Sequence, residues 1–140
     1  MKTPFVLILV ILFFSFSEDQ PECGERSLPY WYNGINSRVE GENITIRRAF
    51  AELQEYTNNI YPVDGFITLR LHISKTGKLC DMEVFEIDKD YQKTSFNQGE
   101  LARELQMIAI ELKDWKRDKE LKTYNLIRFK IKDGKIEEIF

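Results

Sequence analysis

The chain of 140 residues has few of the side chains that metal sites and many catalytic sites need. It contains one histidine, His72, and two cysteines, Cys23 and Cys80. A single imidazole cannot hold zinc alone, and neither residue type has the spacing of a metal-binding motif. Adjacent carboxylates such as Glu137 and Glu138 are typical of a solvated surface. We therefore predict no metal site, and a structural, half-exposed position for His72.

Sequence signatures of common enzyme classes are also missing. The chain has no Gly-x-Ser-x-Gly elbow, no phosphate-binding loop and no dinucleotide fingerprint. Its 20 basic and 23 acidic residues are interleaved and give a net charge of −3. This distribution leaves no basic face for nucleic acid. We predict a protein with no catalytic residues, no cofactor and no nucleic-acid partner.

The chain lacks an apolar run long enough to cross a membrane. Its most apolar segment, residues 5–16, has 12 residues and follows Lys2. A helix of that length reaches only ~18 Å, whereas the hydrocarbon core is about 30 Å thick. Small residues at Ser15 and Ser17 suit a signal peptidase, so residues 1–17 are predicted to be a signal peptide cleaved after Ser17 rather than a retained anchor. The protein would then be exported, either periplasmic or secreted, and would meet the membrane only through targeting.

Two cysteines in an exported chain invite a disulfide. A bond between Cys23 and Cys80 would close a loop of 57 residues. By loop entropy it would stabilise the fold by about 3–4 kcal/mol. The alternative is a pair of free thiols, with Cys80 simply packed in the β-bulge that is predicted below.

Residues 66–86 carry the pattern of a β-hairpin. Positions 67, 69, 71 and 73 are apolar and alternate with more polar residues, as in a half-buried strand. Gly77 lies in the turn that follows. The apolar residues of the return strand are spaced by three and then by two, at Leu79, Met82 and Val84. The step of three predicts a β-bulge at Cys80–Asp81.

Two segments have helical periodicity. The first is predicted to start at Asn43 or Thr45, whose side chains can cap it, and to end near Asn58 and Asn59. The second has the strongest apolar stripe in the chain, formed by Leu101, Leu105, Ile108, Leu112 and Trp115. Small residues beside that stripe allow a close approach to a sheet. We predict one long helix over residues 101–115.

The C-terminal region alternates again. Residues 124–131 form a predicted strand, and Asp133-Gly134 is a strong turn signal before a return over residues 135–140. The order is therefore helix, strand, strand, helix, strand, strand. We predict an α+β fold in two layers, with one long helix on a small antiparallel sheet. Residues 43–140 would form this domain. Residues 18–42 would be an irregular leader whose aromatic triplet at 30–32 covers one end of the core.

This pattern resembles the C-terminal domain of TonB-type energy transducers over residues 45–131. The matching positions are Gly65, the alternation at 67–73, Gly77-Lys78-Leu79, Met82, Val84, Glu86 and Trp115-Lys116. The chain departs from the family pattern in three places. Ile87-Asp88-Lys89 replaces Ser-Ser-Gly, the proline after Trp-Lys is absent, and no long proline-rich spacer precedes the domain.

The resemblance implies a non-catalytic binding module that adds an extended partner segment to a sheet edge, with a link to outer-membrane transport. The corresponding edge is the strand over residues 124–131, and its selective side chains would be Tyr124, Leu126, Arg128 and Lys130. The hairpin at Asp133-Gly134 leaves a second outcome open, in which residues 135–140 cap that edge. A homodimer is also left open.

A different class of function stays open beside this one. The chain could be a small secreted enzyme or inhibitor with an α+β fold like that of cystatins. The candidate face for such an activity carries Arg70, His72 and Arg128. An enzyme would need these residues to line a concave, polar pocket.

Overall fold

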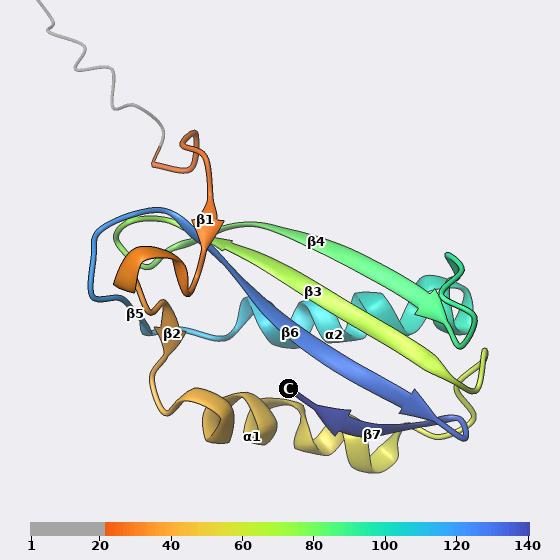
Figure 1. The fold of residues 1–140 in the computed structure, drawn as a ribbon. Helices are drawn as coiled ribbons and strands as arrows, with labels where there is room; N and C mark the ends of the chain where they lie inside the picture. The colour runs from red at the N-terminus through yellow and green to blue at the C-terminus, as the bar shows by residue number, and fades with distance from the viewer. Residues whose placement is uncertain (1–21) are drawn as a thin grey trace, which may run out of the picture.

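The computed structural model describes residues 22–140, and the predicted signal peptide lies outside the described residues. A five-stranded sheet is its centre (Figure 1). The elements in chain order are β1 (Leu28–Pro29), η1 (Tyr32–Gly34), β2 (Arg38–Val39), α1 (Glu42–Tyr56), β3 (Gly65–Ile73), β4 (Leu79–Asp88), η2 (Phe96–Gly99), α2 (Glu100–Ile110), β5 (Trp115–Lys116), β6 (Thr123–Lys132) and β7 (Lys135–Ile139).

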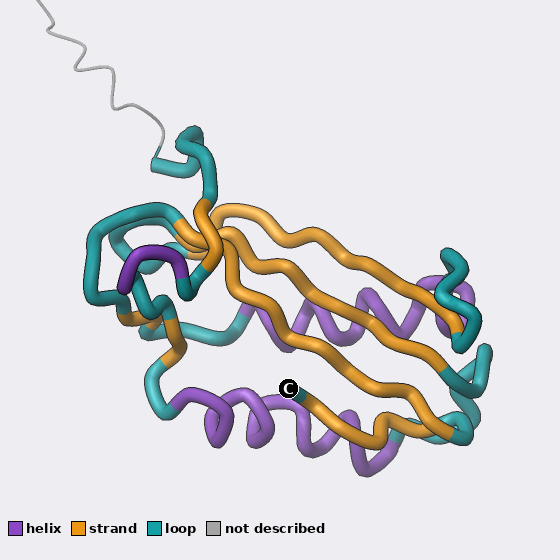
Figure 2. The backbone as a smooth tube through the Cα atoms, in the orientation of Figure 1, coloured by secondary structure: helices purple, strands orange, loops and turns teal. Residues whose placement is uncertain are grey.

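The predicted α+β class is confirmed. The strands of the main sheet follow the order β1-β6-β3-β4, and β7 also pairs with β6. All pairs in this sheet are antiparallel except β1 with β6. β3 lies between β6 and β4, and β4 forms one outer border of the sheet (Figure 2). The strands β2 and β5 form a separate two-stranded ladder.

One face of the sheet is covered and the other is open. The alternation predicted for β3 is confirmed, because its odd-numbered residues are buried while the even-numbered ones are half-buried. The buried residues join β6 side chains and residues of both helices in a single core, which includes Phe50 of α1 and Leu105 of α2. Two helices therefore cover the sheet, where the sequence predicted that a single long helix would. Neither helix in residues 22–140 has the length and hydropathy needed to span a bilayer.

The β-bulge is at the position that the spacing of apolar residues predicted. His72 pairs with Asp81 and Ile73 pairs with Leu79, so Cys80 is the extra residue. A bulge redirects the side chain of the residue it adds. Here the extra residue forms a disulfide with Cys23, with the two Cα atoms 5.4 Å apart. The predicted pairing is thus confirmed, and it fits an oxidising compartment.

The second helix is shorter than predicted. It ends at Ile110, and the chain then changes direction at Asp114, whose φ is 60°. Trp115 belongs to β5 and pairs with Val39 of β2. Both Leu112 and Trp115 are buried. Their helical spacing therefore reflects continued burial against the same core beyond the end of the helix.

Residues 28–39 are more ordered than the predicted leader. β1 adds to β6, and β2 places Val39 in the core at 2% exposure. The aromatic triplet does not cover the end of the core, because Trp31 and Tyr32 are 56% and 51% exposed. Ile35, which follows the triplet, is fully buried. The alternation of apolar residues is too short here to be recognised in the sequence.

Candidate binding sites at the sheet edges

The predicted partner-binding strand is not a free edge along most of its length. Tyr124, Leu126, Arg128 and Lys130 all lie on β6, whose inner side pairs with β3. On the outer side β7 pairs with residues 129–132, and β1 pairs with residues 123–124. The capped outcome that the Asp133-Gly134 turn left open is therefore the one observed. Strand addition along all of residues 124–131 is excluded by these two neighbours.

At Leu126, the outer side of β6 pairs with neither β1 nor β7, and this position is called the gap below. The C=O of Tyr124 accepts a hydrogen bond from Tyr30, and Arg128 exchanges two hydrogen bonds with Phe140, at 2.6 and 2.9 Å. Alternate residues of a strand direct their main-chain groups to the same side. The N–H and C=O of Leu126 therefore point outward, between the end of β1 and the end of β7. None of the described residues makes a main-chain hydrogen bond to them on this side.

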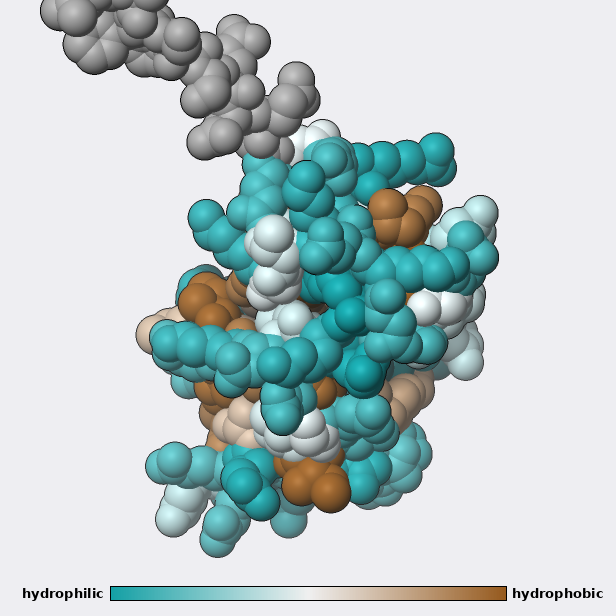
Figure 3. Space-filling view, turned by 90° about the vertical axis from the view of Figure 1, so that its left-hand side faces the viewer, coloured by the Kyte–Doolittle hydropathy of each residue, from teal (hydrophilic) through white to brown (hydrophobic). Residues whose placement is uncertain are grey.

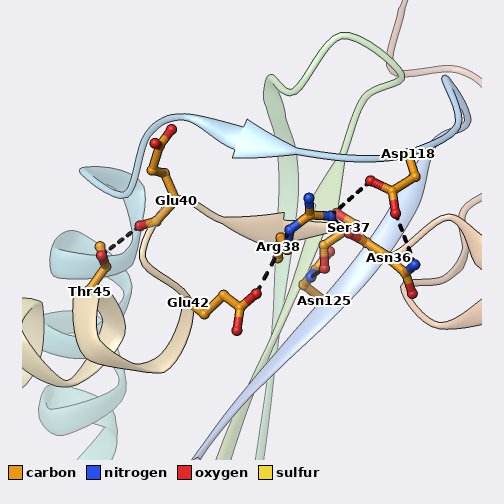
Figure 4. Close-up of polar contacts among 8 residues, drawn as sticks. All are labelled: Asn36, Ser37, Arg38, Glu40, Glu42, Thr45, Asp118 and Asn125. Atoms are coloured by element: carbon orange, nitrogen blue, oxygen red, sulfur yellow. Dashed lines mark hydrogen bonds and ion pairs between the residues drawn. The ribbon is translucent and has the colours of Figure 1, made fainter.

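A cavity of about 590 Å³ lies at this gap. Its apolar lining includes Val39, Ile127 and Phe140, and its polar lining includes Ser37 and Asn125. Figure 4 shows how β2, the start of α1, and β6 bring these polar residues together. At the end of the molecule that carries β2 and β5, hydrophilic side chains dominate and apolar residues show between them (Figure 3).

The polar groups that line this cavity differ in whether they have hydrogen-bond or ion-pair partners. The Asn125 side chain donates a hydrogen bond to the C=O of Ser37 at 2.7 Å. Ser37 is 3% exposed, and its Oγ has no hydrogen-bond partner in the structure. Arg38 is held by Asp118 at 3.1 Å and by Glu42 at 3.8 Å. A hydroxyl that is buried and unpaired is costly, so Ser37 is the unusual member of the set.

The ion pair of Arg38 is fixed by a second contact. Asn36 donates a hydrogen bond to Asp118 at 3.0 Å, and Arg38 donates another to the same carboxylate. Hydrogen bonds from Asn36 and then Arg38 hold the pKa of Asp118 below its usual value. The guanidinium of Arg38 also donates to the C=O of Asn36 at 2.7 Å. Its positive charge is therefore already balanced.

The other border of the sheet, β4, is open. Among residues 22–140, β4 pairs with β3 alone, except near its C-terminal end, where the C=O of Glu86 accepts from Thr94 and the N–H of Asp88 donates to Gln92. By alternation, the main chain of Met82 and Val84 also points outward. The N–H of Met82 donates to the side chain of Asp81 at 2.8 Å. Val84 is left with an outward N–H and C=O.

The open strand is acidic. β4 carries Asp81, Glu83, Glu86 and Asp88 and has no basic residue. The hydrogen bond from His72, helped by Arg70, lowers the pKa of Glu83. Burial raises the pKa of Glu86, although its carboxylate accepts a hydrogen bond from Phe96 at 3.1 Å. An acidic edge repels a second acidic strand, which is a common defence against aggregation.

The open face of the sheet holds the residues of the alternative enzyme hypothesis. Arg70 lies between two aromatic rings, 4.8 Å from the ring centre of Phe85 and 5.0 Å from that of Tyr124. His72 accepts or donates one hydrogen bond with Ser27 and another with Glu83, each 2.7 Å long.

The structure brings only part of that predicted face together. Arg70 and His72 both contact the carboxylate of Glu83. Arg128 is engaged elsewhere, because it donates to Thr68 at 3.1 Å and lies over the ring of Phe66. Within residues 22–140, no three acidic, histidine or cysteine side chains gather in a group that could hold a metal ion.

Comparison with known protein families, with curated proteins and with solved structures finds no match for this chain. The likeness to TonB C-terminal domains therefore stays a prediction. Sequence reasoning missed the open edge of β4 and the cavity residues Ser37 and Asn125. A lone serine and a lone asparagine give no signal in a sequence, since only the fold brings them to one place.

Proposed function

We propose that this protein is an exported, non-catalytic binding module that takes an extended segment of a partner protein as an added strand on the edge of β4. The observation that carries this proposal is the outward N–H and C=O of Val84 on a strand of ten residues that, among the described residues, pairs with β3 alone except near its C-terminal end. Main-chain hydrogen bonds of this kind give affinity in strand addition, and alternate side chains give selectivity. The binding edge is thus on β4 and not on β6.

The charge of β4 indicates the chemistry of the partner. β4 has four carboxylates and no basic side chain. Glu83 is already bound by Arg70 and His72, and the other three carboxylates favour an extended segment that carries lysine or arginine. A second copy of the chain fits less well, because two β4 strands side by side would bring carboxylates together. Phe85, which is 42% exposed on the open face, offers an apolar contact to alternate residues of the added strand.

Export and the link to outer-membrane transport belong to the same proposal. The disulfide supports a compartment outside the cytosol. The order of α1, β3, β4, α2 and β6 supports the likeness to TonB-type domains, which also bind extended segments. The partner we propose is accordingly a basic, extended region of another exported or outer-membrane protein.

Proline at position 84 tests this proposal. Val84→Pro removes the outward N–H but no hydrogen bond to β3, so the sheet can keep its ladder. The probe is a fluorescent peptide of eight residues in which lysine and valine alternate. We expect the affinity of Val84→Pro for this peptide to fall at least tenfold, measured by fluorescence anisotropy.

Two controls make the result specific. Val84→Thr keeps the N–H and should bind like the native chain, and a peptide with glutamate in place of lysine should bind more weakly than the basic one. Urea denaturation of each variant verifies that it is folded. Equal binding by Val84→Pro and the native chain would refute strand addition at β4.

The hydrogen-bonded series Ser27–His72–Glu83 favours a second candidate function, hydrolysis of an ester. A hydroxyl bonded to an imidazole that is bonded in turn to a carboxylate is the arrangement that activates a nucleophile. The test is turnover of 4-nitrophenyl acetate by the native chain and by Ser27→Ala. Equal rates for the two proteins would leave the series with only a structural role, joining the segment before β1 to β3 and β4.

A further inference from the structure

We propose that the cavity at Leu126 is a second binding site, which takes a small neutral ligand with an apolar side group beside a secondary amide. An N-acylated, amidated amino acid belongs to this class. The site is separate from the edge of β4, because it opens on the opposite border of the sheet between β1 and β7. The proposal therefore goes beyond strand addition and does not depend on it.

The main chain of Leu126 defines the hydrogen-bonding half of the ligand. Its outward N–H and C=O lie between Tyr30 on one side and Phe140 on the other, and both neighbours are already bonded to β6. Only one residue of β6 is free in this gap. A ligand that offers one C=O and one N–H in the geometry of an antiparallel pair satisfies both groups, and a longer strand does not fit.

Ser37 supplies a further polar contact. Its side chain is buried at 3% exposure and lines the cavity, and its hydroxyl has no hydrogen-bond partner in the part of the chain that the structure describes. Asn125 fixes the position of this residue by donating to its C=O at 2.7 Å (Figure 4). A buried hydroxyl without a partner costs stability, and a ligand carbonyl or amide would satisfy it. An unpaired buried hydroxyl is expected in a binding site whose hydrogen bonds are completed only when the ligand is present.

The rest of the lining favours an apolar side group. Val39, Trp115 and Ile127 are at most 6% exposed and contribute to the wall of the cavity. Phe140, which is 52% exposed, lies at its rim. The volume of about 590 Å³ is within the range of roughly 300–1,000 Å³ for small-molecule sites. A leucine-sized or phenylalanine-sized group fits this space.

The charges at the cavity favour a neutral ligand over a carboxylate. Arg38 is the basic residue of the lining, and its guanidinium is already bound by Asp118 and by Glu42. An anionic ligand would meet two carboxylates and one cation that is already balanced. We therefore expect the site to bind an amidated amino acid more tightly than the free acid.

The experiment is an NMR titration of the whole chain without its predicted signal peptide, with N-acetyl-leucine methylamide as the probe. We expect the amide signals of Ser37 and Leu126 to shift together as the probe binds. Ser37→Ala should weaken binding at least tenfold without lowering the melting temperature, because it removes an unpaired hydroxyl. The exposed Ser95 gives a matched control, and Ser95→Ala should bind the probe like the native chain.

Two further measurements decide the chemistry and the independence of the site. N-acetyl-leucine, with its free carboxylate, should bind more weakly than the methylamide. Val84→Pro should bind the methylamide normally, so failure of strand addition at β4 and failure of this site can be told apart. Unchanged binding by Ser37→Ala, or probe-induced shifts that avoid Leu126, would overturn the proposal.

Discussion

Removal of the disulfide between Cys23 and Cys80 is the perturbation whose cost can be worked out most directly. The bond joins residues separated by 57 positions in the sequence. In the chain-entropy description, opening a loop of that length lowers the free energy of unfolding by about 4 kcal/mol. Domains of this size are stable by roughly 5–15 kcal/mol. The Cys23→Ser, Cys80→Ser double variant should therefore fold, but with much of its stability lost.

The loss should also have a local component. The segment before β1 is held to the sheet by the disulfide, by Lys122, which donates to the C=O of Cys23 at 2.5 Å, and by the contact between Ser27 and His72. β1 itself pairs with β6 over only two residues. Without the crosslink, the amides of Leu28 and Tyr30 should exchange with solvent much faster than those of β3.

Urea denaturation followed by tryptophan fluorescence measures the global effect, and hydrogen exchange measures the local one. The native protein after reduction by dithiothreitol should give the same free energy of unfolding as the double variant. A loss below about 1 kcal/mol would refute the loop-entropy reasoning, because the constraint on the unfolded chain depends on loop length. Slow exchange of Leu28 in the double variant would show that β1 does not need the crosslink.

Two other predictions concern the core and the edge of the sheet. Phe50 is fully buried, with its ring centre 4.8 Å from that of Phe129. Phe50→Ala should lower the free energy of unfolding by about 3–5 kcal/mol, measured by urea denaturation. A loss below about 1 kcal/mol would contradict this packing. Burial raises the pKa of Glu86, so the folded state disfavours the ionised carboxylate and loses stability as the pH rises through the carboxyl range. Glu86→Gln keeps a hydrogen-bond acceptor for the N–H of Phe96. It should therefore raise the urea midpoint at pH 7 but hardly change it at pH 3. An equal change at both pH values would exclude ionisation of Glu86 as the cause of the lost stability.

The local pattern of β3 and β4 could be predicted because it depends on neighbouring residues. A strict alternation over residues 67–73 permits only one face of β3 to be buried, and the step of three after Leu79 requires an extra residue. The same step recurs in β7, where Lys130 pairs with Glu138 and Ile131 pairs with Ile136. The turn signal at Asp133-Gly134 likewise needs only local backbone geometry.

The end of α2 could not be predicted in this way. Apolar residues continue at helical spacing to Trp115, although the helix ends at Ile110. Spacing reports which residues are buried, and it does not report whether they reach the core from a helix or from the strand that follows. The pairing of Trp115 with Val39, residues far apart in the sequence, decides the outcome.

The candidate sites depend on tertiary structure even more strongly. The sequence identified β6 as a strand with a possible cap, but β1 comes from a segment with no recognisable pattern. Its pairing leaves Leu126 as the one residue of β6 whose outward main chain is unpaired by residues 22–140. Ser37 and Asn125 meet in the cavity although 88 residues separate them. Neither residue type has a pattern that indicates such a meeting.

The sequence by itself determined the α+β class, the β3–β4 hairpin with its bulge, and the two cysteines available for a disulfide, because each depends on periodicity, turn chemistry or composition. Tertiary structure alone decided which border of the sheet is open. A main-chain group becomes available only when no other part of the chain pairs with it, and that depends on contacts between distant segments. For this reason we propose β4, and not β6, as the edge that a partner strand joins.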